Sequence, residues 1–345
     1  MNKISSTQAP LEFSGHQYLR QILTLSMLSG RQVIIKKIRS QHANPGLMPY
    51  EVNLISLIEK VTNGCMVNIS KTGTKLIFKP GIIDSNEGLN VEHTCDLARN
   101  ISYYMEVICT LAIFGKTEMN VTLHGNTDDT IDQSVDSFSR AFNYVLEQFG
   151  LPSGSFNMKV IKRGFAPLGG GQVQIRQMYA RKLESVSLIE EGKVKRVRGW
   201  VTSAKVSPQL TTRVVDKLRE VFNDYIPDVW IHTDHYKKGQ AGDQAGYAVS
   251  LQAETTTGVI LTKDFMYESS KFKMPEDLGE RCAQEMLDEI FTGGVIDSTN
   301  QSMVLMLAAL GAGDNISQVK LGRVTQQTIH LLRHLKAFFN LQFKI

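Results

Sequence analysis

The chain has 345 residues, more than one ordinary hydrophobic core organises, so we expect two domains. Hydrophobic residues make up 42% and charged residues 21%, which is typical of a globular protein rather than a disordered one. No apolar run reaches the roughly 18 residues that a membrane-spanning helix needs. Four scattered cysteines indicate free thiols, and the net charge of +4 permits a nucleic-acid partner without requiring one.

The first half of the chain alternates predicted strands and helices. A strand or turn, a helix and a strand are predicted over 11–40, a second helix over 50–61 and a pair of strands over 66–78. A similar order returns as helix, strand, helix and two strands, at 90–114, 120–124, 135–148, 155–161 and 172–178. This recurrence predicts repeated units, each a small sheet covered by two helices.

The pattern changes between residues 184 and 277. A strand, a helix and three further strands are predicted there, at 194–204, 211–222, 228–233, 248–253 and 259–261. A third, partial copy of the repeat follows as three helices and one short strand, at 280–291, 301–310, 328–339 and 318–322. We therefore predict an α/β (α+β) fold. Residues 1–183 and 278–345 form a large three-repeat domain, and 184–277 form a smaller inserted α/β domain.

The most distinctive stretch is Arg163–Val173, which reads Arg-Gly-Phe-Ala-Pro-Leu-Gly-Gly-Gly-Gln-Val. Consecutive glycines lose the most backbone entropy on folding, so they are expected where something passes close to the backbone. Two interpretations stay open. The glycines contact a phosphate or an RNA backbone, or they permit tight packing or a bulge where the next strand begins.

A dense basic run opens the predicted strand at 194–204, and it comprises Lys193, Lys195, Arg196 and Arg198. Only part of this charge can lie on one face of a strand. Two interpretations therefore stay open: the run contacts RNA or an acidic partner, or it is a solvated surface. His232 and Asp234 share a strand face, but no further ligands complete a set of three or four, so we predict no metal site. Neither a nucleophile motif nor a phosphate-binding Walker loop occurs.

The stretch Arg163–Val173 matches the Arg-Gly-x-x-Pro-x-Gly-Gly-Gly-x-Val signature of the RNA 3′-terminal phosphate cyclase family without a mismatch. The segments Thr122–Thr127, Ala253–Gly258 and Gly293–Asp297 also resemble this family, in the same order. The resemblance covers almost the whole chain. It implies three repeats of a unit with two helices and four strands, with a small α/β domain inserted after the second repeat.

The chain departs from the family at the nucleophile. Cyclases of this family act through a histidine that ATP adenylates, in a His-x-x-Thr-Asn context near the C-terminus. Here the region Gly322–Ile329 contains no histidine, and the nucleophile position falls near Val324. A valine cannot form a phosphoramidate, so nucleotidyl transfer by that route is excluded. The loop Glu12–Arg20 also lacks the family's triple glycine, so we expect a degraded ATP and metal pocket and no bound cofactor.

This combination resembles the eukaryotic nucleolar, non-cyclase branch of the family. The resemblance implies a ribosome biogenesis factor of the small-subunit processome, located in the nucleus and nucleolus, that acts in early pre-rRNA processing with the small nucleolar RNP. It also implies a large nucleolar GTPase as partner, with the protein otherwise monomeric. An endoribonuclease that itself cleaves pre-rRNA is the alternative, and its candidate residues form no recognisable set: Asp128, Asp132, Asp297 and His42.

Two groups of residues are predicted to bind partners, and no catalytic residue is predicted. The family's ligand groove lies beside the signature stretch, which makes the anion- or RNA-binding candidates Lys162, Arg163, Gly169, Gly170, Gly171, Gln172, Arg20 and Arg39. The candidates for binding the GTPase are basic residues of the insert strand and the C-terminal region, namely Lys193, Lys195, Arg196, Arg198, Lys320, Arg323 and Arg333.

Overall fold

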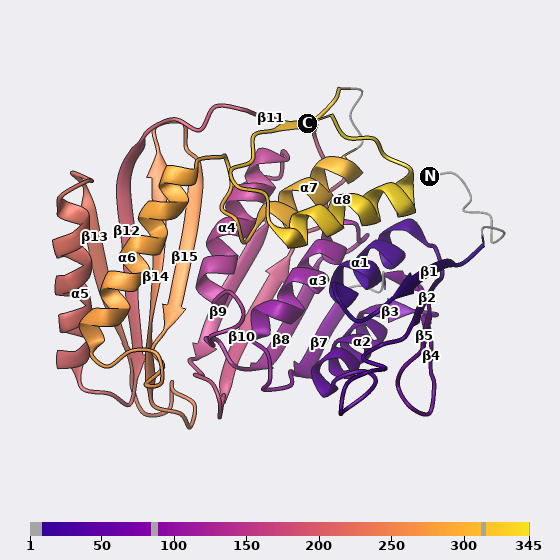
Figure 1. Cartoon of the computed structure of the whole chain (residues 1–345), viewed down its shortest axis with the longest axis horizontal. Helices are drawn as coiled ribbons and strands as arrows, with labels where there is room; N and C mark the ends of the chain where they lie inside the picture. Colours follow the sequence, from indigo (N-terminus) through magenta and orange to yellow (C-terminus); the bar gives the residue numbers. More distant parts are fainter. Residues whose placement is uncertain (1–8, 84–88, 312–314, 345) are drawn as a thin grey trace.

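The computed structural model describes residues 9–83, 89–311 and 315–344. Three four-stranded sheets follow one another along the long axis of the molecule, and helices cover them (Figure 1). The predicted α/β class is confirmed. Among the described residues, no helix is both long and apolar enough to cross a lipid bilayer.

The first sheet has the strand order β1-β2-β5-β4. Its strands are β1 (Leu11–Ser14), β2 (Val33–Lys36), β4 (Met66–Ile69) and β5 (Leu76–Lys79). β1 and β2 are parallel, whereas β5 runs antiparallel to both of its neighbours. The unit also contains α1 (Leu19–Ser29), α2 (Pro49–Val61) and the short pair β3 (Thr62–Asn63) and β6 (Ile82–Ile83). α1 ends at Gly30, whose φ of 71° lies in the left-handed region that favours glycine.

The second sheet repeats this arrangement strand for strand, with the order β7-β8-β10-β9. Its strands are β7 (Leu89–Thr94), β8 (Met119–Gly125), β9 (Phe156–Lys162) and β10 (Gly171–Gln177). The first two strands are again parallel and the others antiparallel. The helices are α3 (Ile101–Ile113) and α4 (Val135–Gln148). The side chain of Ser134 caps α4 by accepting a hydrogen bond from the Ser137 amide.

The third sheet has a different order, β13-β12-β14-β15, and a hydrophobic core of its own. Its strands are β12 (Val194–Ala204), β13 (Val229–Tyr236), β14 (Gly246–Thr255) and β15 (Ile260–Met266). The helices α5 (Pro208–Asn223) and α6 (Pro275–Thr292) pack on one of its faces. The domain division at 183/184 and 277/278 stays a prediction. α6 crosses the second of these boundaries, and its buried residues belong to the core of the third sheet.

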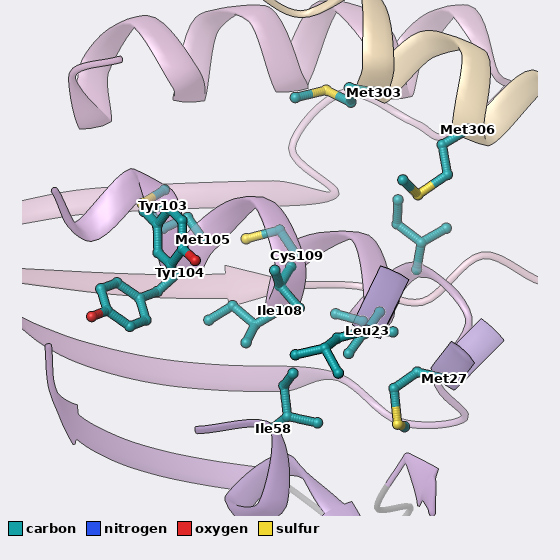
Figure 2. Packing of buried hydrophobic residues seen from close by; sticks show 14 of the residues in the cluster. Leu23, Met27, Ile58, Tyr103, Tyr104, Met105, Ile108, Cys109, Met303 and Met306 are labelled. Atoms are coloured by element: carbon teal, nitrogen blue, oxygen red, sulfur yellow. The ribbon is translucent and has the colours of Figure 1, made fainter. Parts of the chain in front are cut away.

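The C-terminal residues pack against the first two units. α7 (Gln301–Leu310) and α8 (Gln326–Phe339) share one core with α1 and α3. Figure 2 shows Met303 and Met306 of α7 in this core with buried side chains of α1 and α3. β16 (Gln318–Val319) pairs with β11 (Ser187–Leu188) in a short parallel ribbon. After residue 278, the described residues supply no strand besides β16. The expected third copy therefore contributes helices but no four-stranded sheet in this part of the chain.

Candidate functional site

The guanidinium of Arg163, the first residue of the signature stretch, is buried, with 1% of the side chain exposed. Its Nη1 donates to Asp136 Oδ2 at 2.6 Å and to Asp128 Oδ2 at 3.1 Å, while Nη2 donates to the Tyr236 hydroxyl. Burial alone would lower the pKa of Arg163, but Asp136 and Asp128 raise it well above its usual range. This burial counts against the prediction that Arg163 contacts RNA, because Asp128 and Asp136 pair with its guanidinium inside the protein.

The three glycines of the signature are held in close packing. A Cβ at Gly169 would lie 2.6 Å from Leu97 Cδ2, and one at Gly171 would lie 2.8 Å from the Gly125 carbonyl oxygen. One at Gly170 would lie 2.9 Å from the Cα of Gly242. Each of these distances is shorter than a real Cβ contact allows. Tight packing therefore accounts for all three glycines, which favours the second interpretation of the stretch.

The signature also joins the second and third sheets. The Arg163 amide donates to the Gln240 carbonyl at 2.8 Å, and the Gly242 amide donates to the Arg163 carbonyl at 2.7 Å. On the other side, the Thr127 amide donates to the Gly164 carbonyl at 2.7 Å. The neighbouring candidates are more open, since Lys162 and Gly170 are exposed and Gln172 is half-buried. The stretch is thus a structural junction with an exposed rim.

A groove lies beside this junction, between α1, α3 and the loop at 129–133. It consists of three adjoining cavities of about 230, 180 and 530 Å³. Arg20, Arg99 and Gln327 line the first two cavities, and Asp132 and Thr299 line the second and third. Residues distant in sequence therefore meet in the groove, including one from the N-terminal helix and one from the C-terminal helix.

The arginines of this groove are each neutralised by a carboxylate. Four ion pairs do this, namely Arg20–Glu106 at 2.6 Å, Arg39–Glu51 at 2.7 Å, the bidentate pair of Arg99 with Asp132, and the pair of Arg281 with Glu285. Arg39 is buried with 6% of its side chain exposed, which counts against the prediction that it contacts RNA. Arg20 does line the groove, but its charge is already paired. A site built this way offers little uncompensated charge to a phosphate.

Sequence reasoning missed Arg99 and Tyr103. The guanidinium carbon of Arg99 lies 4.3 Å from the centre of the Tyr103 ring, and that of Arg20 lies 4.6 Å from it. Burial alone would lower the pKa of Arg99, but hydrogen bonding and charge interaction with Asp132 raise it. No motif marks these residues.

Val324, the position of the missing nucleophile, lies in the turn before α8. Its side chain is 45% exposed. The turn is fixed on both sides, because Gln301 Nε2 donates to the Arg323 carbonyl at 3.0 Å and Thr325 caps α8. The same helix begins with Gln327 in the groove.

The predicted GTPase-binding residues fall into two classes. Four are already paired, since Lys195 and Arg196 share Glu254, Arg198 pairs with Asp228, and Lys320 pairs with Glu191. The others are exposed, and within the described ranges no carboxylate pairs with them: Lys193, Arg323 and Arg333. The second class offers free positive charge to a partner.

The residues suggested for an endoribonuclease are not gathered in one place. Asp128 is bound by Arg163, and buried Asp297 accepts hydrogen bonds from Thr262 and Asn300. Asp132 lies in the groove, whereas His42 is exposed. Over the described ranges, no three His, Cys, Asp or Glu side chains form a group that could hold a metal ion. The predicted absence of a recognisable set agrees with this dispersion.

Comparison with known proteins identifies the family to which this chain belongs. The family model of the RNA 3′-terminal phosphate cyclases matches residues 11–345, and the chain belongs to this family. Two relatives, each called "RNA 3′-terminal phosphate cyclase-like protein", come from Bos taurus and Homo sapiens. They are 44% and 43% identical, over 99% of this chain and 91% of each relative. The "rRNA processing protein rcl1" of Schizosaccharomyces pombe is 34% identical, over 98% of this chain and 93% of the relative. The chain therefore falls in the eukaryotic cyclase-like branch, as predicted.

Proposed function

We propose that this protein is a ribosome biogenesis factor that has lost cyclase chemistry and acts in early pre-rRNA processing within the small-subunit processome. The observation that carries the proposal is the region Gly322–Ile329, which contains no histidine where the family's nucleophile is expected, near Val324. The relative named as an rRNA processing protein supports the choice of process. We place the protein in the nucleus and nucleolus for the same reason.

The charge balance of the groove supports the loss of nucleotide chemistry. Arg20, Arg39 and Arg99 each bind a carboxylate of this chain, so a triphosphate would have to displace Glu106, Glu51 or Asp132. Displacing a buried ion-pair partner leaves a carboxylate unpaired, which costs several kcal/mol. The groove is therefore suited to holding the fold together rather than to gripping ATP.

The test combines a biochemical and a cellular measurement. Purified protein is incubated with labelled ATP and an RNA that ends in a 3′-phosphate, and we expect neither a covalent AMP adduct nor a cyclic end. Depletion from cells should lead to accumulation of the precursor of the small-subunit rRNA, and re-expression should reverse it. A stable AMP adduct, or normal rRNA processing after depletion, would refute the proposal.

We further propose that the factor works by binding a large nucleolar GTPase through the free basic residues near the C-terminus. Arg323 and Arg333 are exposed and carry no ion pair within the described ranges, unlike Lys320, which binds Glu191. A double Arg323→Glu, Arg333→Glu variant should lose capture of the GTPase in a pull-down. The matched control is Arg176→Glu, an exposed arginine on the second sheet that should leave capture unchanged. Equal capture by both variants would exclude this surface.

A further inference from the structure

One half of the third sheet carries an uncovered face that the proposed function does not use. α5 and α6 cover the opposite face of the sheet. On the uncovered side, α4 packs mainly on β14 and β15, where Ser137 Oγ lies 2.9 Å from Ser250 Oγ and the Ser134 amide donates to Asp264 Oδ2 at 2.7 Å. Its Arg140 also reaches Trp200 on β12. β12 and β13 extend past α4 toward the edge of the molecule (Figure 1). On this face the outward side chains of Trp230 and His232 on β13 are exposed, whereas Trp200 on β12 is half-buried and Thr202 is buried.

Both tryptophans of the chain lie on this uncovered half. Trp200 on β12 lies opposite His232 on β13, and Trp230 lies opposite Arg198. The ring centres of Trp200 and Trp230 are each 5.9 Å from that of His232, so the three rings form a continuous row. The Trp230 side chain is 58% exposed. A large aromatic side chain left in water on a sheet face is unusual unless something stacks on it.

Positive charge surrounds this aromatic row. The guanidinium carbon of Arg140 lies 3.7 Å from the centre of the Trp200 ring, at the inner end of the row. Lys195, Arg196 and Arg198 follow along β12, and they are balanced by only two carboxylates, Glu254 and Asp228. The pair of Arg198 with Asp228 is open to solvent, since Asp228 is 53% exposed, so a phosphate can compete for Arg198 at little cost.

We propose that the uncovered half of the third sheet binds single-stranded RNA, with bases stacked on Trp230 and His232 and phosphates near Arg196 and Arg198. Open sheets with exposed aromatic side chains bind unpaired bases in this manner, because every base has a flat face to stack. A protein partner fits less well, since the centres of protein interfaces are depleted of charge, whereas this face carries Arg196, Arg198 and Asp234. The inference deepens the proposed function by adding a direct RNA contact.

The chain offers a clean probe of this face. Its intrinsic tryptophan fluorescence comes only from Trp200 and Trp230, so a single-stranded RNA of about 10 nucleotides should quench it on binding. Trp230→Ala should weaken binding by about 5- to 150-fold, the loss expected for one base stack, while Trp230→Phe should retain most of the affinity. Phe291→Ala removes an aromatic side chain that is 92% exposed on α6 and should leave affinity unchanged. A duplex of the same sequence should bind weakly, because its bases are not free to stack.

The outcomes separate this inference from the proposed function. Absence of quenching by single-stranded RNA, or equal affinity of wild type and Trp230→Ala, overturns the RNA site and leaves the depletion experiment unaffected. Loss of GTPase capture in Trp230→Ala without any RNA binding would identify the face as a protein-docking surface and would also overturn the inference. Since Trp230 is exposed, thermal unfolding of Trp230→Ala should match that of wild type, which confirms that the variant is folded.

Discussion

The signature stretch and the uncovered half of the third sheet contain the same kinds of residue and use them in opposite ways. In the signature, Arg163 lies over the ring of Tyr236 at 4.9 Å, is bound by two carboxylates and is closed off from water. On the sheet, Arg198 lies opposite Trp230, is paired with one exposed carboxylate and faces solvent. The most conspicuous motif in the sequence thus builds the fold, whereas an inconspicuous strand presents a binding surface.

This difference teaches that a motif can be kept for its packing after its chemistry is gone. The glycines of the signature fit against Gly125, Leu97 and Gly242, and these contacts hold two sheets together. Because any side chain larger than hydrogen would disturb them, the motif persists whether or not a ligand binds nearby. Four substitutions test the contrast between the two regions.

The largest effect is expected for Arg163→Met. The substitution leaves Asp128 and Asp136 buried without their cation, which should lower the free energy of unfolding by about 3–5 kcal/mol. Urea unfolding followed by circular dichroism measures the change. Arg176→Met is the control, since that arginine is 62% exposed in its pair with Glu118 and should cost less than about 1 kcal/mol. Similar losses for the two variants would show that Arg163 is not a structural cation.

Gly164→Ala tests the close packing of the same stretch. A Cβ at this position would overlap the Gly171 backbone, so we expect a loss of about 1–3 kcal/mol in the free energy of unfolding. Gly311→Ala is the matched control, because there the nearest atom would lie 3.6 Å away and φ is −60°. A neutral Gly164→Ala variant would contradict the packing account of the signature.

The carboxyl of Asp264 lies where α4 meets the third sheet, and we expect it to make the stability of the fold depend on pH. Burial raises the pKa of its carboxyl from 3.8 to about 7, so between pH 4 and 7 the folded state holds a proton that the unfolded state releases. Stability from this group therefore falls as pH rises through that window. Asp264→Asn cannot titrate and should be more stable relative to wild type above pH 7 than at pH 4. Parallel stability curves from pH 4 to 8 would refute the assignment.

The smallest effect on stability is expected for a substitution on the uncovered half of the third sheet. Arg198→Ala removes a surface ion pair with Asp228 and should change the free energy of unfolding by less than about 1 kcal/mol. Its affinity for single-stranded RNA should nevertheless fall, and the salt dependence of binding should become shallower by about one phosphate contact. A large loss of stability would contradict this and would show that Arg198, like Arg163, is a cation needed for the fold.

Much of the fold could be predicted from local pattern, and the exposure of individual side chains could not. The helices of the first two units and the stop at Gly30 follow from apolar spacing and one glycine. The burial of Arg163 depends on Asp136 and on Tyr236, which lies 73 residues away, so no local pattern reveals it. For the same reason Arg99 was missed, since its partner Asp132 comes from a different loop. The basic run on β12 was found as a binding candidate, but its aromatic neighbours on β13 are set by strand register.

The hydrogen bonds between Arg163 and the loop at 240–242 have a geometric consequence. They fix the third sheet to the second, so the aromatic row on β12 and β13 and the basic residues before and on α8 are held at a set separation. If a partner binds the basic residues at α8 while RNA lies on the aromatic row, the protein sets the distance between the partner and the RNA. The hydrogen bonds of the signature stretch therefore keep the distance between these two surfaces constant.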